Sequence, residues 1–279
     1  MNSLTLKSHA KINIGLNVIS KREDGFHNLE TIFYPINLFD EITFTKSDVF
    51  NFNSDNKILN DEKNNLIVKS IYELEKFFNT KFFVETSLIK NIPIGAGLGG
   101  GSSNAATTLL GLLKLFELNI PQNDLLQIAL QLGSDVPFFL NPIPSFAESR
   151  GEILTPINIK INKYILIVNP GIHIATKWAF ELVKPELPVN SLKNLLSKSE
   201  IKLEDLHKSV SNDFENIVFK QYPEIKEIKN KMLEFGAELA LMTGTGSTVW
   251  GIFDEEEPAY QTELYFKCRN FFTYIESPI

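Results

Sequence analysis

The segment PIGAGLGGGSSNAA, residues 93–106, decides how the rest of the chain is interpreted. It is the densest glycine cluster in the sequence, and it leads into a run of helical character that begins near Asn104. Glycines let backbone N–H groups close on an anion, and the dipole of the following helix adds a favourable potential. The segment therefore predicts a phosphate-binding loop followed by a helix, with its Ser/Asn group supplying the helix cap.

Two familiar phosphate loops do not fit this segment. Gly95, Gly97 and Gly100 match the dinucleotide pattern G-x-G-x-x-G, but that reading requires a strand–helix–strand unit with an acid about 20 residues further on. Here the first helix runs into a second one near Asn123, and Glu117 falls at a helix end. A Walker A loop needs a lysine directly after its last glycine, and none is present. The segment therefore belongs to another kind of phosphate loop.

The chain on either side of the loop alternates between strand and helix patterns. Strand patterns are expected at residues 10–19, 26–36, 40–45, 81–89, 164–170 and 249–253. Helix patterns are expected from Asn65, from Asn123 to a stop at Gly133, and around residues 224–235. A charged turn occupies residues 21–25, and a glycine turn occupies residues 242–248. Because strands and helices mix without strict alternation, the pattern predicts an α+β fold.

A change in the sequence pattern separates two expected domains. Pro142, Pro144 and Pro156 bracket this change. We place the boundary near residue 155, which gives domains of residues 1–155 and 156–279. A chain of 279 residues is long enough for two ordinary domains.

Composition limits the classes of protein to which the chain can belong. With 43% hydrophobic and 22% charged residues, the chain has the composition of a globular protein. The formal net charge of -7 argues against non-specific nucleic-acid binding, which requires a basic face. Cys268 is the single cysteine, so no intrachain disulfide can form. With no signal peptide and no apolar run of roughly 18 residues, we expect a cytoplasmic protein without membrane contact.

Four ordered motifs, within residues 9–253, resemble those of the GHMP kinases, which include galactokinase, homoserine kinase and mevalonate kinase. The first is the loop of residues 93–106, similar to the P-x-x-x-G-L-G-[GS]-S-S loop of that family. AKINIGL at residues 10–16, followed by REDGFHNLET at residues 22–31, resembles the A-K-[IL]-N and R-x-D-G-[YF]-H signatures. GSDVPF at residues 133–138 and LMTGTGS at residues 241–247 complete the set.

The resemblance implies a fold and a reaction. The implied fold has an N-terminal S5-like α/β domain and a C-terminal ferredoxin-like α/β domain. The implied activity is ATP-dependent phosphorylation of a small molecule. The form GLGGGSSNAA is most similar to the branch that acts on the 2-hydroxyl of a cytidine diphosphate-linked methylerythritol, in isoprenoid precursor synthesis by the methylerythritol phosphate pathway. Alternatives are another GHMP kinase, of homoserine or mevalonate type, or a non-catalytic nucleotide-binding protein of this fold.

The same resemblance assigns roles to individual residues. Lys11 and Asp135 are the implied catalytic residues: Asp135 is the base, and Lys11 pairs with Asp135 and holds the acceptor hydroxyl. The implied ATP-binding residues are Asn65, Pro93, Gly95, Gly97, Leu98, Gly99, Gly100, Gly101, Ser102 and Ser103. The implied substrate-binding residues are Asn13, Phe26, His27, Phe180, Gly244 and Gly246, with Phe26, His27 and Phe180 around the cytosine. Mg²⁺ is expected to arrive with ATP and to meet Ser103, with no protein ligand identified. A monomer or weak homodimer is expected.

Several of these residues also have a plain structural interpretation. Asp135 lies between Gly133 and an apolar stretch, a setting that suits a general base and a helix cap equally. Lys11 lies in a strand pattern, where a lysine is usually solvated. Asn65 is also a natural helix cap. Phe26 and His27 would ordinarily be a core residue and an incidental histidine, and Trp178 rivals Phe180 as the second stacking aromatic.

Overall fold

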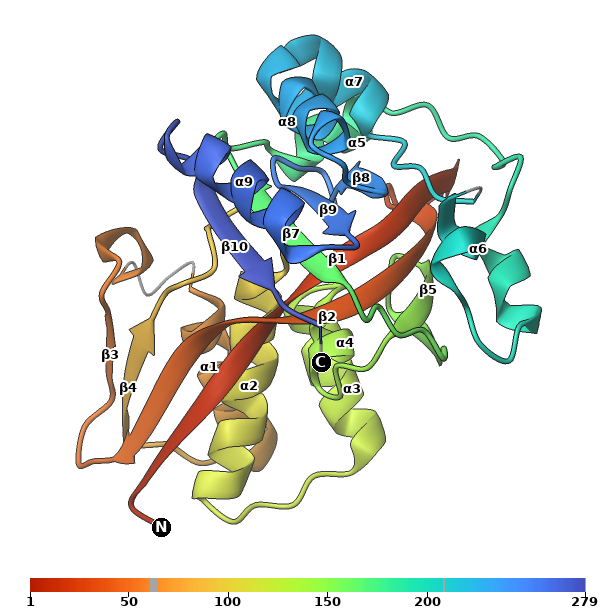
Figure 1. Ribbon diagram of the computed structural model, residues 1–279. Helices are drawn as coiled ribbons and strands as arrows, with labels where there is room; N and C mark the ends of the chain where they lie inside the picture. Colours follow the sequence, from red (N-terminus) through yellow and green to blue (C-terminus); the bar gives the residue numbers. More distant parts are fainter. Residues whose placement is uncertain (61–64, 208, 279) are drawn as a thin grey trace. The chain divides into compact units, whose positions relative to one another are not determined.

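The computed structural model describes residues 1–60, 65–207 and 209–278, which pack into two compact units. The first unit consists of Met1–Ala10, Asn37–Ile94 and Gly99–Pro142. The second consists of Lys11–Ile36, Gly95–Leu98 and Ile143–Ile279. Strands β1 (Ser3–Lys21) and β2 (His27–Lys46) contribute residues to both units (Figure 1).

The first unit combines strands with four helices of the described segments. Residues 41–46 of β2 pair antiparallel with β4 (Val84–Ile89), and β3 (Asn51–Ser54) pairs parallel with β4. Burial alternates along β4, so one face of this strand turns toward the core. The helices are α1 (Leu66–Phe78), α2 (Gly100–Leu115), α3 (Gln122–Leu132) and α4 (Val136–Phe139), with the short 3₁₀ helix η1 (Lys57–Asn60) before them.

Helix α1 packs against α2, and α4 packs against α2 and α3. Helix α1 begins where Asn65 caps it, since the Asn65 side chain accepts a hydrogen bond from the Ile67 N–H. Ile67, Ile71 and Leu74 then recur at helical spacing and are all buried, which gives α1 one apolar face. The predicted helix from Asn65 is therefore confirmed, as is its structural role as a cap.

The start of α2 differs from the sequence expectation. The helix begins at Gly100 with Gly99 in the N-cap position, at φ 72°, so the cap residue has no side chain with which to bond the first turn. Ser102, Ser103 and Asn104 lie inside the helix. The expected Ser/Asn cap is therefore wrong. The physical reason is that the left-handed backbone at Gly99 already turns the chain into the helix, which leaves the hydroxyl side chains free for other contacts.

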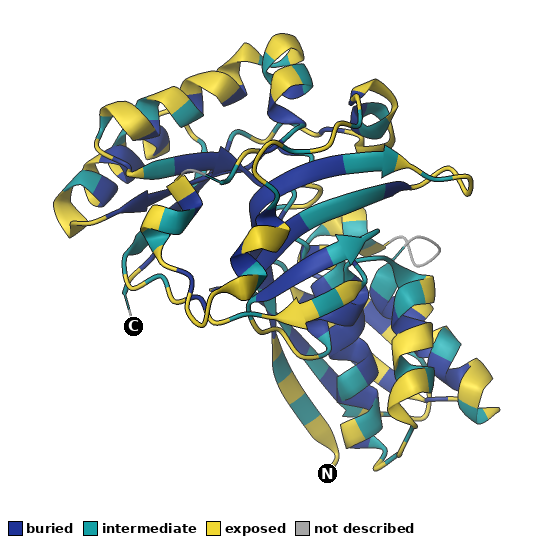
Figure 2. Cartoon of the chain, turned by 90° about the vertical axis from the view of Figure 1, so that its right-hand side faces the viewer, coloured by how far each residue is buried: buried dark blue, intermediate teal, exposed yellow. Residues whose placement is uncertain are grey.

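The second unit contains a sheet in the order β10-β7-β9-β8. Its strands pair antiparallel and are β7 (Tyr164–Asn169), β8 (Leu239–Met242), β9 (Val249–Phe253) and β10 (Phe272–Glu276). Residues 29–33 of β2 pair with β5 (Ser145–Ser149), which pairs with β6 (Ile153–Pro156). Figure 2 shows buried strands in dark blue and helices with exposed outer faces in yellow.

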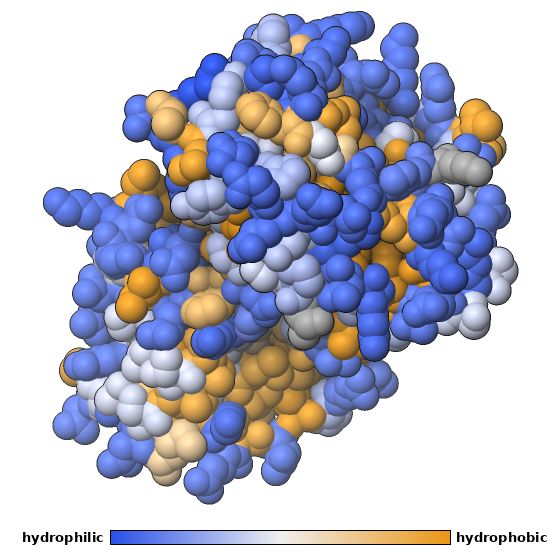
Figure 3. Space-filling view, viewed as in Figure 1, coloured by the Kyte–Doolittle hydropathy of each residue, from blue (hydrophilic) through white to orange (hydrophobic). Residues whose placement is uncertain are grey.

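Helices α8 (Pro223–Glu234) and α9 (Glu256–Lys267) pack against this sheet. The remaining helical segments of the second unit are shorter: α5 (Thr176–Leu182), η2 (Leu192–Ser197), α6 (Leu203–His207) and α7 (Glu215–Gln221). Leu166, Phe214, Met232 and Phe253 belong to the buried core of this unit. None of the helices in the described ranges is long and apolar enough to cross a membrane. Polar side chains cover most of the face seen in Figure 3.

Most predicted strands are confirmed, but two of them form one strand. Residues 26–36 and 40–45 both fall within the continuous β2, apart from Phe26, which precedes it. Pro35 lies between the stretch of β2 that pairs with β5 and the stretch that pairs with β4, so it interrupts neither of those ladders. The compact units are discontinuous in sequence. They are therefore a different division from the boundary near residue 155, which stays a proposal.

Candidate active site

Lys11 is a buried cation beside the glycine-rich loop. Its side chain is 3% exposed, and it lies in the stretch of β1, residues 10–18, that is buried on both faces, so it is not solvated. The ammonium donates to Asn13 Oδ1 and to the carbonyl of Gly97 at 3.3 Å, and it lies 5.0 Å from the centroid of the Phe33 ring. The Lys11 N–H also donates to the Leu98 carbonyl at 3.0 Å. Strand β1 therefore holds a positive charge directly against the loop.

Asn13 lies two residues further along β1 and is equally buried, at 2% exposed. Its Nδ2 donates to Thr31 Oγ1 at 2.9 Å, and its backbone N–H donates to Thr243 Oγ1 at 2.9 Å. The Thr243 hydroxyl is within reach of both Asn13 Oδ1 at 3.1 Å and the Gly97 carbonyl at 3.2 Å, and its single proton can serve one of them at a time. Asn13 is therefore fixed from two sides.

The turn before β9 packs against the glycine-rich loop at its glycines. A Cβ placed on Gly97 would lie 2.3 Å from the Thr243 carbonyl oxygen and 3.2 Å from that of Gly246. A Cβ on Gly244 would lie 3.3 Å from Gly97 Cα. The structure thus brings the turn of Gly244 and Gly246 against the loop. A contact of these glycines with substrate stays a prediction.

Two of the three residues expected around a cytosine lie against each other. The rings of His27 and Phe180 are stacked, with centroids 5.1 Å apart and an interplanar angle of 29°. Phe180 also meets Phe214 edge-on at 4.8 Å, which fixes its ring. Trp178 packs instead against Tyr222. Of the two rival aromatics, Phe180 is the one beside His27.

Phe26 is 48% exposed and directly follows the tight turn of residues 22–25. The Arg150 guanidinium lies 3.9 Å from its centroid, in the geometry of a cation–π contact. The turn itself is held by Asp24, whose Oδ1 accepts from the Phe26 N–H at 3.1 Å. The fold therefore presents an aromatic face at the surface beside a cation.

Burial sets the charge state of His27. The side chain is buried within the second unit, which lowers the pKa of the imidazole below its ordinary value, and the nearby positive charge of Lys21 lowers it further. The ring is therefore neutral at physiological pH, with one nitrogen as a donor and the other as an acceptor. A neutral imidazole can hydrogen-bond the edge of an uncharged base.

Asp135 lies in the first unit, at the N-cap position of α4. In the described part of the chain its side chain makes no capping hydrogen bond to that helix. The capping role left open by the sequence is therefore not the one that the carboxylate plays. Lys11 belongs to the second unit, and the implied pairing of Lys11 with Asp135 stays a prediction.

Asn65, in contrast, forms hydrogen bonds within the first unit with both polar atoms of its side chain. Its Oδ1 accepts from the Ile67 N–H at 2.9 Å, and its Nδ2 donates to the Leu59 carbonyl at 2.8 Å. The contact with adenine that the resemblance implies stays a prediction. Ser103 is 1% exposed and accepts a hydrogen bond from Ser8 at 2.8 Å.

The described residues do not form a resident metal site. They include no group of three or more His, Cys, Asp or Glu side chains that could hold an ion. The Ser103 hydroxyl accepts one hydrogen bond, from Ser8, and keeps a second lone pair for a further partner. A contact of Ser103 with Mg²⁺ stays a prediction.

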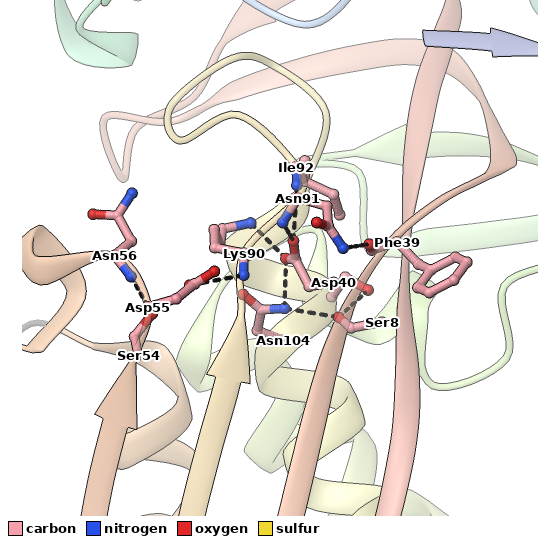
Figure 4. A network of polar contacts seen from close by, with 11 residues as sticks. Ser8, Phe39, Asp40, Ser54, Asp55, Asn56, Lys90, Asn91, Ile92 and Asn104 are labelled. Carbon is pink, nitrogen blue, oxygen red and sulfur yellow. Dashed lines mark hydrogen bonds and ion pairs between the residues drawn. The ribbon is translucent and has the colours of Figure 1, made fainter.

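Sequence reasoning missed a buried polar network beside the loop (Figure 4). Its centre is Asp40, which is fully buried on β2 and bonded to the residues just before the loop and to Asn104 on α2. The available signal was an acid that shares its strand face with the apolar residues Leu38 and Ile42, together with Lys90 and Asn91 directly before the loop. Thr31 and Thr243 were missed as well, because a threonine in a strand or turn carries no distinctive pattern.

Family models match both halves of the chain. The model described as GHMP kinases N terminal domain matches residues 65–141, and the model described as GHMP kinases C terminal matches residues 192–271. Together with the glycine-rich loop and the buried lysine beside it, these matches define the class of protein. The chain is a GHMP kinase with the two-domain α+β fold of that class.

Full-length relatives narrow the class. A 4-diphosphocytidyl-2-C-methyl-D-erythritol kinase of Chlorobium phaeobacteroides (strain BS1) is 39% identical over 96% of this chain and 95% of its own. One of Bacteroides fragilis is 41% identical over 92% of this chain and 98% of its own. A crystal structure of 4-(cytidine 5'-diphospho)-2C-methyl-D-erythritol kinase superposes with a TM-score of 0.81 at 29% identity, covering 98% of both chains. The chain belongs to the family of 4-diphosphocytidyl-2-C-methyl-D-erythritol kinases.

Proposed function

We propose that the protein transfers the γ-phosphoryl group of ATP to the 2-hydroxyl of 4-diphosphocytidyl-2-C-methyl-D-erythritol. The observation that carries this proposal is the identity of 39% to 41% with kinases of that name over nearly their whole length. The acceptor oxygen bonds to the γ-phosphorus while the bond from that phosphorus to the bridging oxygen of ADP breaks. The hydroxyl proton goes to a base, and ADP leaves.

Lys11 and Asp135 are the proposed catalytic residues. We assign Asp135 the role of base because it belongs to the GSDVPF segment, which resembles a motif of the family, and directly precedes the buried apolar residues of α4. We assign Lys11 the role of holding the acceptor hydroxyl, because a buried ammonium beside the loop can attract the oxygen that becomes more negative during transfer. Asn13, fixed by Thr31 and Thr243, is the proposed orienting residue.

The backbone of the glycine-rich loop is the proposed cradle for the ATP phosphates. Three of its glycines, Gly95, Gly97 and Gly99, have positive φ, which turns successive amides in directions that other residues rarely allow. Mg²⁺ enters with ATP, as part of the nucleotide substrate.

The cytosine is proposed to meet Phe26, His27 and Phe180. Stacking on an aromatic ring contributes about 1–3 kcal/mol per base and tolerates any base, so it cannot select cytosine alone. Selection then requires hydrogen bonds at the base edge, where a mismatch leaves a buried group unpaired at a cost of about 1–3 kcal/mol. The neutral His27 ring, stacked on Phe180, is the proposed reader of that edge.

Three further expectations accompany this proposal. A domain boundary near residue 155 is supported by family matches that fall on either side of it, at residues 65–141 and 192–271. A cytoplasmic location is supported by the single cysteine, Cys268. A monomer or weak homodimer without nucleic-acid partners remains the expected state.

ATP turnover against a panel of acceptors tests the proposal. We expect ADP release with 4-diphosphocytidyl-2-C-methyl-D-erythritol, and at least about a hundredfold lower turnover efficiency with methylerythritol 4-phosphate, homoserine or mevalonate. Equal efficiency with an acceptor that lacks the cytidine head would favour another GHMP kinase activity. ATP binding without turnover on any acceptor would favour a non-catalytic protein.

A further inference from the structure

We propose that Asp40 is a positioning residue for the glycine-rich loop, with its carboxylate fixing the chain just before the loop and the helix just after it. The inference rests on the proposed function, because it concerns how well the loop is arranged to bind the phosphates of ATP. Asp40 lies on β2 and is 0% exposed (Figure 4).

The carboxylate of Asp40 has a full set of donors. Oδ1 accepts from the backbone N–H groups of Asn91 and Ile92, each at 2.8 Å. Oδ2 accepts from Asn104 Nδ2 at 2.9 Å and from the Lys90 ammonium. A carboxylate offers about four lone-pair directions, so its hydrogen-bonding capacity is used. A group bonded in this way has one position, and it transmits that position to its donors.

These donors flank the loop in the sequence. Lys90, Asn91 and Ile92 lie directly before Pro93, where the non-helical part of the loop, residues 93–99, begins, and Asn104 lies in the second turn of α2, which follows that part. Asn104 Nδ2 also donates to Ser8 Oγ at 2.9 Å, which ties α2 to β1. Asn91 Nδ2 donates to the Phe39 carbonyl at 2.9 Å, which ties the residue before the loop to β2 a second time.

The two flanks also touch directly. A Cβ on Gly100 would lie 2.9 Å from Lys90 Nζ and 3.0 Å from Ile92 Cγ2, so the first turn of α2 sits against the residues before the loop without space between them. Glycine residues within the loop have little intrinsic preference for one conformation. Contacts around the loop must therefore fix the arrangement of its amides, and Asp40 is a group that bonds the residues on both sides of it.

A buried acid also stabilises a fold in general, so a matched control is needed. Glu75 supplies it within the same unit. It is 8% exposed, and its carboxylate accepts from the Phe82 N–H at 2.9 Å and from Lys81 at 2.7 Å. It thus resembles Asp40 in burial, in its lysine partner and in holding a backbone N–H, but it bonds no residue that flanks the loop.

The test compares Asp40→Asn with Glu75→Gln in the full chain. Calorimetry gives the Kd of ATP and, separately, of cytidine diphosphate, and thermal unfolding gives the stability. We expect both variants to unfold at lower temperature. Asp40→Asn alone should weaken ATP binding, by about tenfold, with cytidine diphosphate affinity unchanged within about twofold. Asn104→Ala, which removes one donor, should weaken ATP binding in the same direction and serves if Asp40→Asn does not fold.

ATP affinity within twofold of wild type in folded Asp40→Asn or Asn104→Ala, or an equal loss in Glu75→Gln, would overturn the positioning role. That outcome differs from failure of the proposed function, in which the wild-type chain itself binds no ATP.

Discussion

At the scale of single residues, Asp135 carries the proposed chemistry. Asp135→Asn keeps the size of the side chain but cannot take up the hydroxyl proton. Loss of a general base costs about 10² to 10⁴ in rate, so kcat should fall by that factor while the Kd of ATP is unchanged. Steady-state turnover and calorimetry give these two quantities.

The control for this substitution is Asp124→Asn, in the first turn of the neighbouring α3. It changes the same charge without touching the proposed machinery, and its turnover should match wild type. An Asp135→Asn protein that keeps more than half of the wild-type turnover would remove Asp135 from the mechanism.

At Gly97 a glycine is required because another part of the chain approaches its backbone closely, and not because the backbone has to be flexible. Gly97 and Gly171 have nearly the same backbone angle, at φ 79° and 77°. A Cβ at Gly171 would meet nothing within 4 Å, whereas one at Gly97 would lie 2.3 Å from the Thr243 carbonyl oxygen. Gly171→Ala should therefore cost about 1–2 kcal/mol of unfolding free energy, from backbone strain alone.

Gly97→Ala should cost about 1–3 kcal/mol more than Gly171→Ala, because the turn of residues 242–248 has to move away. Urea unfolding of the two variants measures the difference. Equal destabilisation by Gly97→Ala and Gly171→Ala would show that the turn of residues 242–248 moves without cost. It would contradict close packing of this turn against the loop.

The burial of His27 makes the unfolding free energy of the protein depend on pH. Its pKa in the folded chain is lowered, so the unfolded chain binds a proton more readily. The contribution of His27 to stability is therefore fully present above its ordinary pKa of about 6.5 and is lost as pH falls through the window below that value. Between about pH 8 and about pH 5, the unfolding free energy of wild type should fall more steeply than that of His27→Gln. Parallel pH dependences would show that the ring is not desolvated.

At the scale of elements, the start of α2 belongs to the glycine-rich loop that we propose binds the ATP phosphates. Gly99 occupies the N-cap at φ 72°, a conformation that a β-branched residue avoids. Gly99→Val should therefore shift the first amides of α2 and weaken ATP binding by about tenfold or more. Calorimetry with ATP measures this change.

Gly236→Val provides a comparison at another positive-φ glycine, at φ 102°, where a Cβ would meet only Pro258 at 3.9 Å. It should lower stability without changing ATP affinity. Unchanged ATP affinity in a folded Gly99→Val protein would place the phosphates elsewhere.

The elements differ in how well the sequence predicts them, and the cause is local. Helix α1 is predicted from Asn65 and its apolar spacing, and β7 from its continuous apolar run. Helix α9 and strand β10 were not predicted. In α9 the buried positions Ala259, Thr262, Glu263 and Phe266 have helical spacing, but two of them are polar, which hides the apolar face. The start of α2 was misplaced because a glycine cap leaves no side-chain signal.

The residues of the candidate site also differ in how well the sequence predicts them. Residues that occur in specific motifs, such as Lys11, Asn13 and His27, could be singled out from the sequence, and the structure shows them buried. Asp40 could not, because it lies outside those motifs and its partners are distant in the sequence. Thr243 lies within the LMTGTGS motif, but a threonine between other residues of a turn gives no sign of its bonds to Asn13 and Gly97. Whether Phe180 or Trp178 lies beside His27 also required the structure, since both residues belong to the same short helix.

At the scale of the whole molecule, the family match and the local geometry support one account. The glycine-rich loop is the proposed place for the phosphates, the buried Lys11 puts a positive charge beside it, and the His27–Phe180 pair supplies stacked aromatic rings. Each of these features occurs in proteins of other function. Their combination in a chain of this family is what makes a cytidine-bearing acceptor the proposed substrate.

The central claim is that the protein transfers one phosphoryl group from ATP to the 2-hydroxyl of 4-diphosphocytidyl-2-C-methyl-D-erythritol. Purified protein, ATP and 4-diphosphocytidyl-2-C-methyl-D-erythritol can be followed together by ³¹P nuclear magnetic resonance. The account predicts one new phosphomonoester signal, on the tertiary carbon C2, with one ADP formed for each acceptor consumed. No new phosphomonoester, or a phosphate attached to another hydroxyl of the acceptor, would contradict it.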